Sequence, residues 1–389
     1  MNSNDDSPID FYNKVFDSYK SEDYFDETTI TINYTKNIVS TDKSERLYKI
    51  DSLSLESSQS DNSNDNLKKF INTCNDNLKK NIYSDEWQLF YLYKELFQFF
   101  ISARGRCNYF RGQSHNYPLV PGILRKNIQN SYRKDFENLY LKIANEFPEK
   151  ITYFELKSSN NIEDREYQLS LLQHYGFKTS LLDITSNPYI AMLFMLSEQF
   201  TEYKELAFFL FQVDENLHRN KHLFTEVRKS KLNERIIAQK GAFLNFDKIF
   251  SNKAFDIERI LSIKIVLHFS DEKYLDYIAS EKEKLSQIEL AESSKIDNGQ
   301  SDYFALLEKE IEQSKIECLR FIKDELSQKL REYYYFEEEL FPDFEKRLQY
   351  LSNKYESSGS KKISLINMIS FFYYFCSRCG LCIVTEIYL

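Results

Sequence analysis

The chain has 389 residues, enough for one large domain or two, and 42% of them are hydrophobic, which is sufficient for a buried core. Only 8 glycines and 6 prolines argue against a turn-rich all-β fold. A net charge of −9 gives no broad basic field, which argues against a sequence-independent nucleic-acid binder but leaves a local basic patch open. The 6 cysteines do not indicate a secreted disulfide framework and no signal peptide begins at Met1, so we expect a cytoplasmic protein.

The first part of the chain, residues 1–82, is rich in Asn, Asp, Ser and Lys, most strongly between Ser57 and Asn66. Such a composition buries too little apolar area to offset the entropy of ordering the chain. We therefore predict a largely disordered N-terminal arm over residues 1–82. Within it, Thr28–Asn33 alternates as a single strand would, so part of the arm can pack locally.

From Ser84 onward the pattern becomes that of a folded domain. Ser84 can cap a helix with a wide aromatic face, and a second helix is centred near Phe136. The apolar runs Leu206–Val213 and Ile263–Phe269 are typical of buried strands. Helices alternating with short apolar strands predict an α+β body with a mixed sheet and flanking helices, rather than a helical bundle.

The most informative stretch runs from Gln168 to Leu196. A helix pattern ends at Gly176, a short buried strand follows over Thr179–Ile184, and Thr185 or Ser186 can then cap a new helix. Pro188 stands near the first position of that helix. Polar side chains thus gather at a strand-to-helix junction, where unpaired backbone N–H groups can bind an anion. An ordinary pair of helix caps explains the same residues and remains an alternative.

A second polar stretch lies upstream, where a strand end runs directly into Arg111 and Gly112. A guanidinium can grip a phosphate or carboxylate with two hydrogen bonds, and a glycine permits close approach of a backbone or a ligand. Together, the two stretches resemble the FRG domain family, which is named for a Phe-Arg-Gly motif. The matching residues are Phe110–Gln113, Tyr117–Pro121 with Arg125, Gln173–Gly176, Thr179, Leu181–Asp183, Thr185, Asn187–Pro188, Ala191, Phe194, Arg235–Phe243 and Leu340–Asp343.

The resemblance covers about residues 87–350 and implies a bacterial protein with an FRG domain over 83–350. It also implies a split sheet like that of ADP-ribosyltransferases, with NAD as ligand or substrate and a protein or nucleic acid as acceptor. On this basis we expect the catalytic residues Arg111, His174, Asp183 and Gln239. The expected cofactor-binding residues are Phe110, Gly112, Gln113, Tyr175, Thr185 and Asn187, and no metal is expected.

Gln239 stands where such an enzyme usually carries a glutamate, and an amide cannot stabilise positive charge as a carboxylate does. Asp183 can take that role, or the domain can bind a nucleotide without turnover. Two classes therefore remain open: an NAD-consuming or ADP-ribose-transferring effector in toxin action or phage defence, and a non-catalytic nucleotide-sensing or protein-interaction module. A hydrolase with His174 as general base ranks third, because no nucleophile in a motif context accompanies it.

The C-terminal third carries two additions. Residues 271–335 are highly charged and helical, which predicts an inserted helical hairpin that packs through Tyr303, Leu306, Leu307 and Ile311. Residues 351–389 form a linker and an apolar tail, whose longest apolar run is too short for the roughly 20 residues of a membrane-spanning helix. Cys376, Cys379 and Cys382 have the spacing of thiolate ligands, but a fourth ligand is missing, so we expect no metal there.

Overall fold

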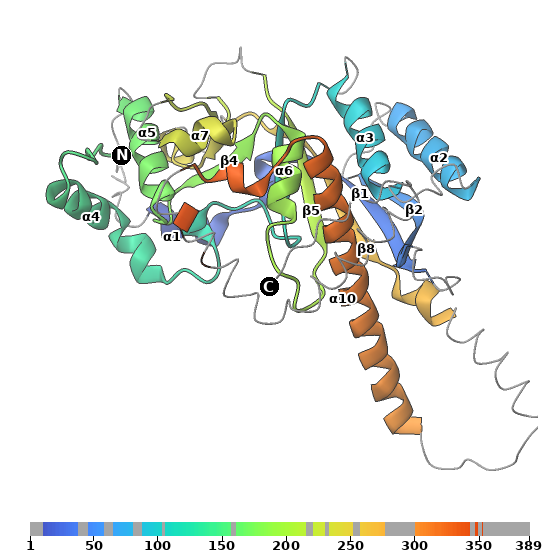
Figure 1. The fold of residues 1–389 in the computed structure, drawn as a ribbon. Coiled ribbons are helices and arrows are strands. Elements are labelled where there is room, and N and C mark those ends of the chain that lie inside the picture. The colour runs from blue at the N-terminus through green and yellow to red at the C-terminus, as the bar shows by residue number, and fades with distance from the viewer. Residues whose placement is uncertain are drawn as a thin grey trace, which may run out of the picture. The chain divides into compact units, whose positions relative to one another are not determined.

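The computed structural model describes residues 11–37, 46–57, 65–80, 88–102, 106–156, 161–214, 221–229, 233–251, 257–276, 300–342, 347–348 and 352 (Figure 1). Its eight strands are β1 (Phe25–Lys36), β2 (Tyr48–Ser57), β3 (Tyr109–Gln113), β4 (Leu181–Thr185), β5 (Leu206–Gln212), β6 (Phe224–Thr225), β7 (Gly241–Asn245) and β8 (Ile260–Phe269). The helices are α1 (Phe11–Ser18), α2 (Asp65–Lys79), α3 (Gln88–Ile101), α4 (Asn130–Glu146), α5 (Ile162–His174), α6 (Pro188–Met195), α7 (Glu234–Ala238), α8 (Lys248–Ser251) and α10 (Gln300–Glu332). Three short 3₁₀ helices are η2 (Ser21–Asp23), η4 (Gly122–Leu124) and η8 (Glu337–Leu340).

All eight strands form one mixed sheet in the order β2-β1-β8-β5-β3-β4-β7-β6. β1 and β8 are parallel, and the other neighbouring pairs are antiparallel. The predicted α+β class with a mixed sheet and flanking helices is therefore confirmed. The strands predicted over Thr179–Ile184, Leu206–Val213 and Ile263–Phe269 correspond to β4, β5 and β8, because apolar runs of this length can be buried on both faces of a central strand.

At the centre of the sheet, β3 and β4 are joined by only a single residue pair. β3 pairs with β5 along its whole length, from Tyr109 to Gln113, but its other edge meets β4 through a single residue pair, Phe110 and Thr185. β4 in turn pairs with β7 along its whole length. The sheet thus consists of two well-paired halves that are joined between β3 and β4 by the Phe110–Thr185 pair.

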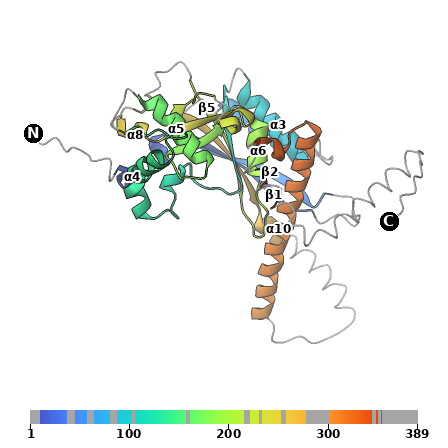
Figure 2. The ribbon, with the colours of Figure 1, turned by 60° about the vertical axis from the view of Figure 1, so that its left-hand side comes forward.

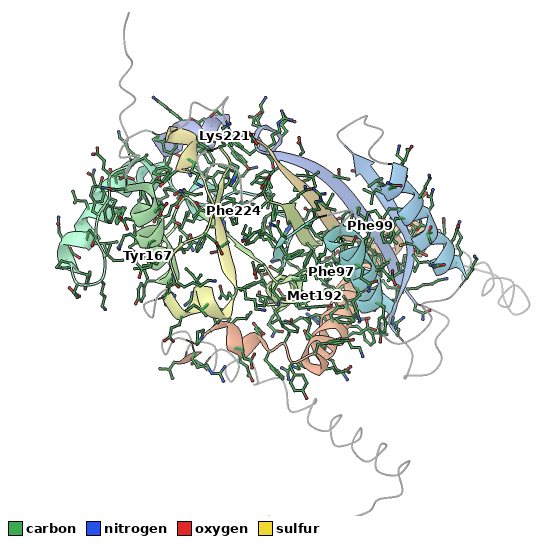
Figure 3. All side chains as sticks on the ribbon, turned by 90° about the horizontal axis from the view of Figure 1, so that it is seen from above. Phe97, Phe99, Tyr167, Met192, Lys221 and Phe224 are labelled. Carbon is green, nitrogen blue, oxygen red and sulfur yellow. The ribbon has the colours of Figure 1, made fainter. Side chains whose placement is uncertain are left out.

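Opposite faces of β3 pack against different sets of side chains. Phe110 contacts Phe97 of α3 and Phe208 of β5, with ring centroids 6.5 and 6.4 Å apart. Tyr109 instead contacts Phe224 at 4.6 Å and belongs to the large core cluster that includes residues of α1, α4 and α5. Figure 3 labels Phe97 of α3 from the first set, and Tyr167 and Phe224 from the large cluster.

Buried ion pairs anchor the N-terminal end of α5. The Arg165 guanidinium binds Asp247 at 2.8 Å and Glu137 at 2.7 Å, and the adjacent Glu166 accepts hydrogen bonds from Thr225 and Asn245. Unpairing buried charges of this kind costs about 3–5 kcal/mol. The network fixes α5 against its neighbours and so determines where its C-terminal end lies.

The N-terminal arm differs from its predicted, largely disordered state. β1 pairs with β8 from Phe25 to Tyr34, and β2 pairs with the other edge of β1. Ile30, Ile32 and Tyr34 alternate into the core and are fully buried. The polar composition misled the prediction because the opposite face of these strands carries Thr, Asn and Ser, so that only half of each strand contributes apolar residues. Residues 58–64, the most Ser/Asn-rich part, lie outside the described chain.

The charged insertion contains α10, a helix of 33 residues that runs beside α3, α6 and β1 (Figures 1 and 2). Its packed face repeats every three or four residues and includes Ile311, Cys318, Ile322, Leu326 and Leu330. The prediction placed the contact further toward the N-terminal end; of those residues Ile311 is buried, while the side chains of Tyr303, Leu306 and Leu307 lie outside the described part. Residues 277–299, where the other arm of a hairpin would fall, also lie outside it.

Residues 338–389 form a second compact unit. Within it, Arg347 donates to the main-chain oxygen of Glu338 at 3.0 Å. The cysteines at 376, 379 and 382 and the apolar tail lie outside the described residues. No helix in the described ranges has the length and apolar character needed to cross a membrane.

Candidate functional site

The Phe-Arg-Gly segment lies in β3, so its three side-chain positions alternate between the faces of the sheet. Phe110 is buried in the layer of α3 and α6. Gly112 shares that face, and a Cβ atom at its position would lie 1.8 Å from the carbonyl oxygen of Ala191 in α6. The glycine is therefore required by close packing of strand and helix. Its predicted contact with a cofactor remains a prediction, and the neighbouring structure already accounts for the residue.

The side chain of Arg111 lies on the opposite face of the sheet from Phe110 and Gly112, at the junction of β3 and β4. Its Nη1 donates to the main-chain oxygen of Asp183 at 2.5 Å. Its Nε is buried and has no hydrogen-bond partner among the described residues. Burial lowers the pKa of the Arg111 guanidinium to about 10; Asp183 opposes this change, and Arg125 adds to it. The side chain thus carries a poorly solvated positive charge with one donor to spare, next to a second arginine.

Asp183 is the one exposed residue of β4, and its carboxylate accepts a hydrogen bond from a side chain at the end of α5. Gln173 Nε2 donates to Asp183 Oδ1 at 2.6 Å, and the hydroxyl of Thr179 donates to Gln173 Oε1. Gln173 can offer its amide here because the helix ends at once: Gly176 has φ +93°, and Phe177 N donates to Leu172 O at 3.0 Å. The predicted helix stop at Gly176 is confirmed.

Thr185 and Asn187 connect elements at the corner between β4 and α6. The Thr185 hydroxyl donates to the main-chain oxygen of Gln239 at 2.7 Å and accepts from Asn187 N. Asn187 Oδ1 accepts from Tyr189 N and Ile190 N, so Asn187 is the N-cap of α6, with Pro188 in the first turn. The predicted cap at Thr185 or Ser186 was wrong by one or two residues, because the cap must stand directly before the proline that begins the helix.

His174 and Tyr175 lie at the end of α5 beside Gln173. The main-chain oxygen of His174 accepts from Arg235 at 3.4 Å, and its ring meets that of Tyr175 edge-on, with centroids 4.9 Å apart. Tyr175 is 58% exposed. Gln239 is joined to this region through its main chain, by the bond from Thr185. The structure therefore brings Arg111, Asp183 and Gln173 into one hydrogen-bonded cluster, with Gln239 linked to it through β4.

The roles of two residues beside Asp183 were not predicted. Gln173 was expected among the polar residues of the site but without a partner, and Thr179 was only a motif residue. No spacing rule shows that an amide at the end of α5 will reach a carboxylate ten residues later in β4. Arg125, which follows η4, was likewise a motif residue without a role. Its charge lowers the pKa of Arg111, and the only signal for this in the sequence is that no acidic residue lies close to Arg125 that could neutralise it.

Comparison with known families identifies the region. Residues 106–204 match the FRG domain. This stretch of the chain is similar to the FRG domain. The matched range contains β3, α5, β4 and α6, and therefore Arg111, Arg125, Gln173 and Asp183; Gln239 and α10 fall after it. No curated protein and no solved structure gives a significant match.

Among the described residues, no three His, Cys, Asp or Glu side chains come together as metal ligands would. The groups that the site does bring together are the Arg111 guanidinium, influenced by Arg125, the exposed Asp183 carboxylate and the amide of Gln173. Such a set suits an anionic ligand with hydroxyl groups nearby.

Proposed function

We propose that the FRG domain binds a nucleotide, with NAD as the expected ligand, and that its phosphate groups bind Arg111. One observation carries this proposal: the Arg111 guanidinium is desolvated, retains a buried Nε without a partner among the described residues, and has a second arginine close by. A phosphate oxygen would accept from Nε and compensate both charges. Charge-assisted bonds of this kind are about twice as strong as neutral ones.

Asp183 is the group we assign to the ribose. Its carboxylate is exposed and oriented by Gln173, whose own oxygen is held by Thr179. A carboxylate fixed in this way can accept from a ribose hydroxyl and can stabilise positive charge that develops on the sugar. The Gln239 amide can accept from a ribose hydroxyl but cannot stabilise positive charge as a carboxylate does.

The reaction we propose begins with cleavage of the bond between nicotinamide and ribose. Nicotinamide leaves with the bonding electron pair, and the ribose carbon becomes an oxocarbenium-like cation next to the Asp183 carboxylate. Water or a nucleophile of an acceptor macromolecule then forms the new bond at that carbon and loses its proton to solvent. Anchoring the pyrophosphate at Arg111 would supply the positional part of the rate enhancement. A cytoplasmic protein that consumed NAD in this way would act as an effector, in toxin action or phage defence.

A second function, nucleotide binding without turnover, is favoured by the amide at Gln239, where an enzyme of this kind would carry a carboxylate. Its main-chain oxygen accepts from Thr185, and its side chain brings no carboxylate to the site. If Asp183 serves only to bind ribose, the FRG domain is a nucleotide sensor or a protein-interaction module.

The test combines calorimetric titration of NAD with an assay for released nicotinamide. We expect binding by the wild-type chain, and release of nicotinamide that is lost in Asp183→Asn while NAD binding persists. Binding without release by the wild-type chain, also in the presence of candidate acceptor proteins and nucleic acids, would establish the sensor instead. Absence of binding to NAD and to simpler nucleotides would refute both nucleotide-binding functions and leave only the protein-interaction module.

A further inference from the structure

Buried polar atoms without partners gather in the segment that begins with Arg111. Gln113 Nε2, His115 Nδ1 and Asn116 Oδ1 have no hydrogen-bond partner among the described residues, as is true of Arg111 Nε. Four of the twelve such side-chain atoms in the described part of the chain thus fall within six consecutive residues. A buried polar atom that stays unsatisfied is unfavourable, because it has lost its hydrogen bonds to water without replacement. The concentration indicates a surface that is completed by a polar ligand.

The orientation of one of these groups is determined by its neighbours. Asn116 Nδ2 donates to Glu205 Oε2 at 3.1 Å, and the other oxygen of Glu205 lies 2.7 Å from His268 Nδ1. Burial alone would raise the pKa of the Glu205 carboxyl, but the hydrogen bonds from His268 and Asn116 hold it below its ordinary value. An ionised carboxylate only accepts, so the NH₂ group of Asn116 must face it. Asn116 Oδ1 is therefore fixed as an acceptor toward the ligand.

An aromatic surface lies in the same segment. The rings of His115 and Tyr117 are stacked, with centroids 4.3 Å apart and planes 25° from parallel. A tight turn, in which Tyr117 N donates to His115 O at 2.7 Å, holds them together. One face of the Tyr117 ring lies against His115, and Tyr117 is 51% exposed. An exposed ring of this kind can stack on a nucleobase, which also offers a planar π-face.

We infer that residues 113–117 form a nucleobase subsite that selects adenine. This inference rests on the proposed nucleotide binding at Arg111. Adenine presents an amino donor and a ring-nitrogen acceptor side by side on one edge. The amino group would donate to Asn116 Oδ1, the ring nitrogen would accept from Gln113 Nε2, and the base would stack on Tyr117. Gln113 follows Arg111 by two residues, about 7 Å along the strand, which separates the base from a phosphate at Arg111.

Hypoxanthine provides the matched comparison, because it carries a carbonyl oxygen where adenine carries the amino group. That oxygen would face Asn116 Oδ1, so two acceptors would meet. Glu205 is a positioning residue in this scheme: it does not touch the base, and it acts by keeping the Asn116 amide from rotating.

The experiment is calorimetric titration of the full chain with two pairs of ligands: NAD and nicotinamide hypoxanthine dinucleotide, and ADP and IDP. We expect the adenine member of each pair to bind on the order of tenfold more tightly. Asn116→Ala and Glu205→Gln should each reduce this preference toward equality. Glu202→Gln is the matched control, because Glu202 lies three residues away with a side chain that is 70% exposed, and it should keep the preference.

Thermal unfolding of each variant separates loss of the subsite from loss of the fold, and Glu205→Gln preserves shape if Asn116→Ala does not fold. Equal binding of both members of a pair by the wild-type chain would overturn the adenine subsite and leave phosphate binding at Arg111 standing. A preference that survives in both Asn116→Ala and Glu205→Gln would overturn it as well. Failure of all four ligands to bind would overturn the subsite together with the proposed function.

Discussion

Arg111 and Asp183 meet through the backbone: the guanidinium donates to the main-chain oxygen of Asp183, and the Asp183 carboxylate accepts from Gln173. The two charges are near enough to influence each other, yet no ion pair between their side chains is formed in the described structure. Arg111 thereby contributes to the junction of β3 and β4, where only one residue pair joins the strands. The carboxylate is left facing outward, oriented but not neutralised.

Substitution of Arg111 should therefore affect binding more than folding. We expect Arg111→Ala to weaken NAD binding by more than tenfold, because a charge-assisted contact to a phosphate contributes about 2–4 kcal/mol. Arg111→Lys should restore only part of the affinity, since an ammonium lacks the planar fork. Calorimetry gives the affinities, and thermal unfolding reports the fold.

Arg259→Ala is the control for Arg111, because Arg259 is half-exposed and pairs with Asp26 on the surface. It should change neither affinity nor stability appreciably. If Arg111→Ala binds NAD normally but unfolds at a much lower temperature, Arg111 has a structural role only.

Gly112→Ala should destabilise the protein strongly. The added methyl would lie 1.8 Å from the Ala191 carbonyl oxygen and 2.8 Å from Met195 N, both backbone atoms of α6, so the helix would have to move. We expect a loss of about 3 kcal/mol or more in urea unfolding. Gly122→Ala is the matched control, because its nearest contacts are 3.4–3.5 Å away, and it should stay within about 1 kcal/mol of wild type. Similar losses in the two variants would contradict the packing argument.

Removal of residues 1–57 should unfold the chain rather than trim it. β1 pairs with β8 over ten residue positions, and its loss would expose β8 together with the partners of Ile30, Ile32 and Tyr34. Limited proteolysis of the intact protein should accordingly leave β1 and β2 attached. Ile32→Ala should lower the free energy of unfolding by about 2–5 kcal/mol, whereas Thr31→Ala should lower it little, because the neighbouring Thr31 is only partly buried. A stable, monodisperse fragment that starts after residue 57 would disprove this.

Stability should fall in mild acid because of His222. Burial lowers the pKa of its imidazole from the ordinary 6.5, Lys248 lowers it further, and Asp214 and Glu258 oppose the change. The unfolded chain therefore binds the proton more readily, so the stability that His222 provides is complete above about pH 6.5 and is lost as the pH falls toward the folded-state pKa. The neutral ring also accepts from Phe224 N at 3.1 Å through Nδ1.

Urea unfolding between about pH 5 and pH 8 measures this effect. His222→Asn retains an acceptor for Phe224 N but does not titrate, so its free energy of unfolding should vary less below pH 6.5 than that of wild type. Parallel profiles for the two proteins would assign the acid sensitivity to other groups.

The sequence predicted the elements whose signals are local. The stop at Gly176 needs only a left-handed residue after an apolar helix, and Pro188 marks the first turn of α6 whatever lies around it. β5 was visible because a strand buried on both faces reads as an unbroken apolar run, and β4 and β8 were visible from the shorter apolar runs that they contain. Arg111 and Asp183 were expected at one site, and the structure joins them by a hydrogen bond.

What the sequence did not predict depends on partners that are distant along the chain. β1 is polar on one face, and only its pairing with β8, more than 200 residues later, makes it part of the sheet. The role of Thr185 was likewise missed: it was predicted as a possible helix cap, but its hydroxyl bonds the main chain of Gln239, 54 residues later. The unpartnered atoms of residues 113–116 have no sequence signal, since satisfaction of a polar atom is a property of its surroundings.

Side chains alternate between the two faces of β3, so Phe110, Arg111 and Gly112 reach their observed surroundings in only one register of the strand. Phe110 and Gly112 face the helices: the phenyl ring fills space there, and the glycine leaves room for the backbone of α6. Arg111, between them, therefore lies on the opposite face, where it bonds Asp183 of β4. Inserting or deleting one residue just before Phe110 would send the arginine into the helix layer and the phenyl ring to the other side. Exchange of the arginine alone would therefore leave the packing of Phe110 and Gly112 against the helices intact, whereas a shift of the motif by one position would disrupt that packing as well.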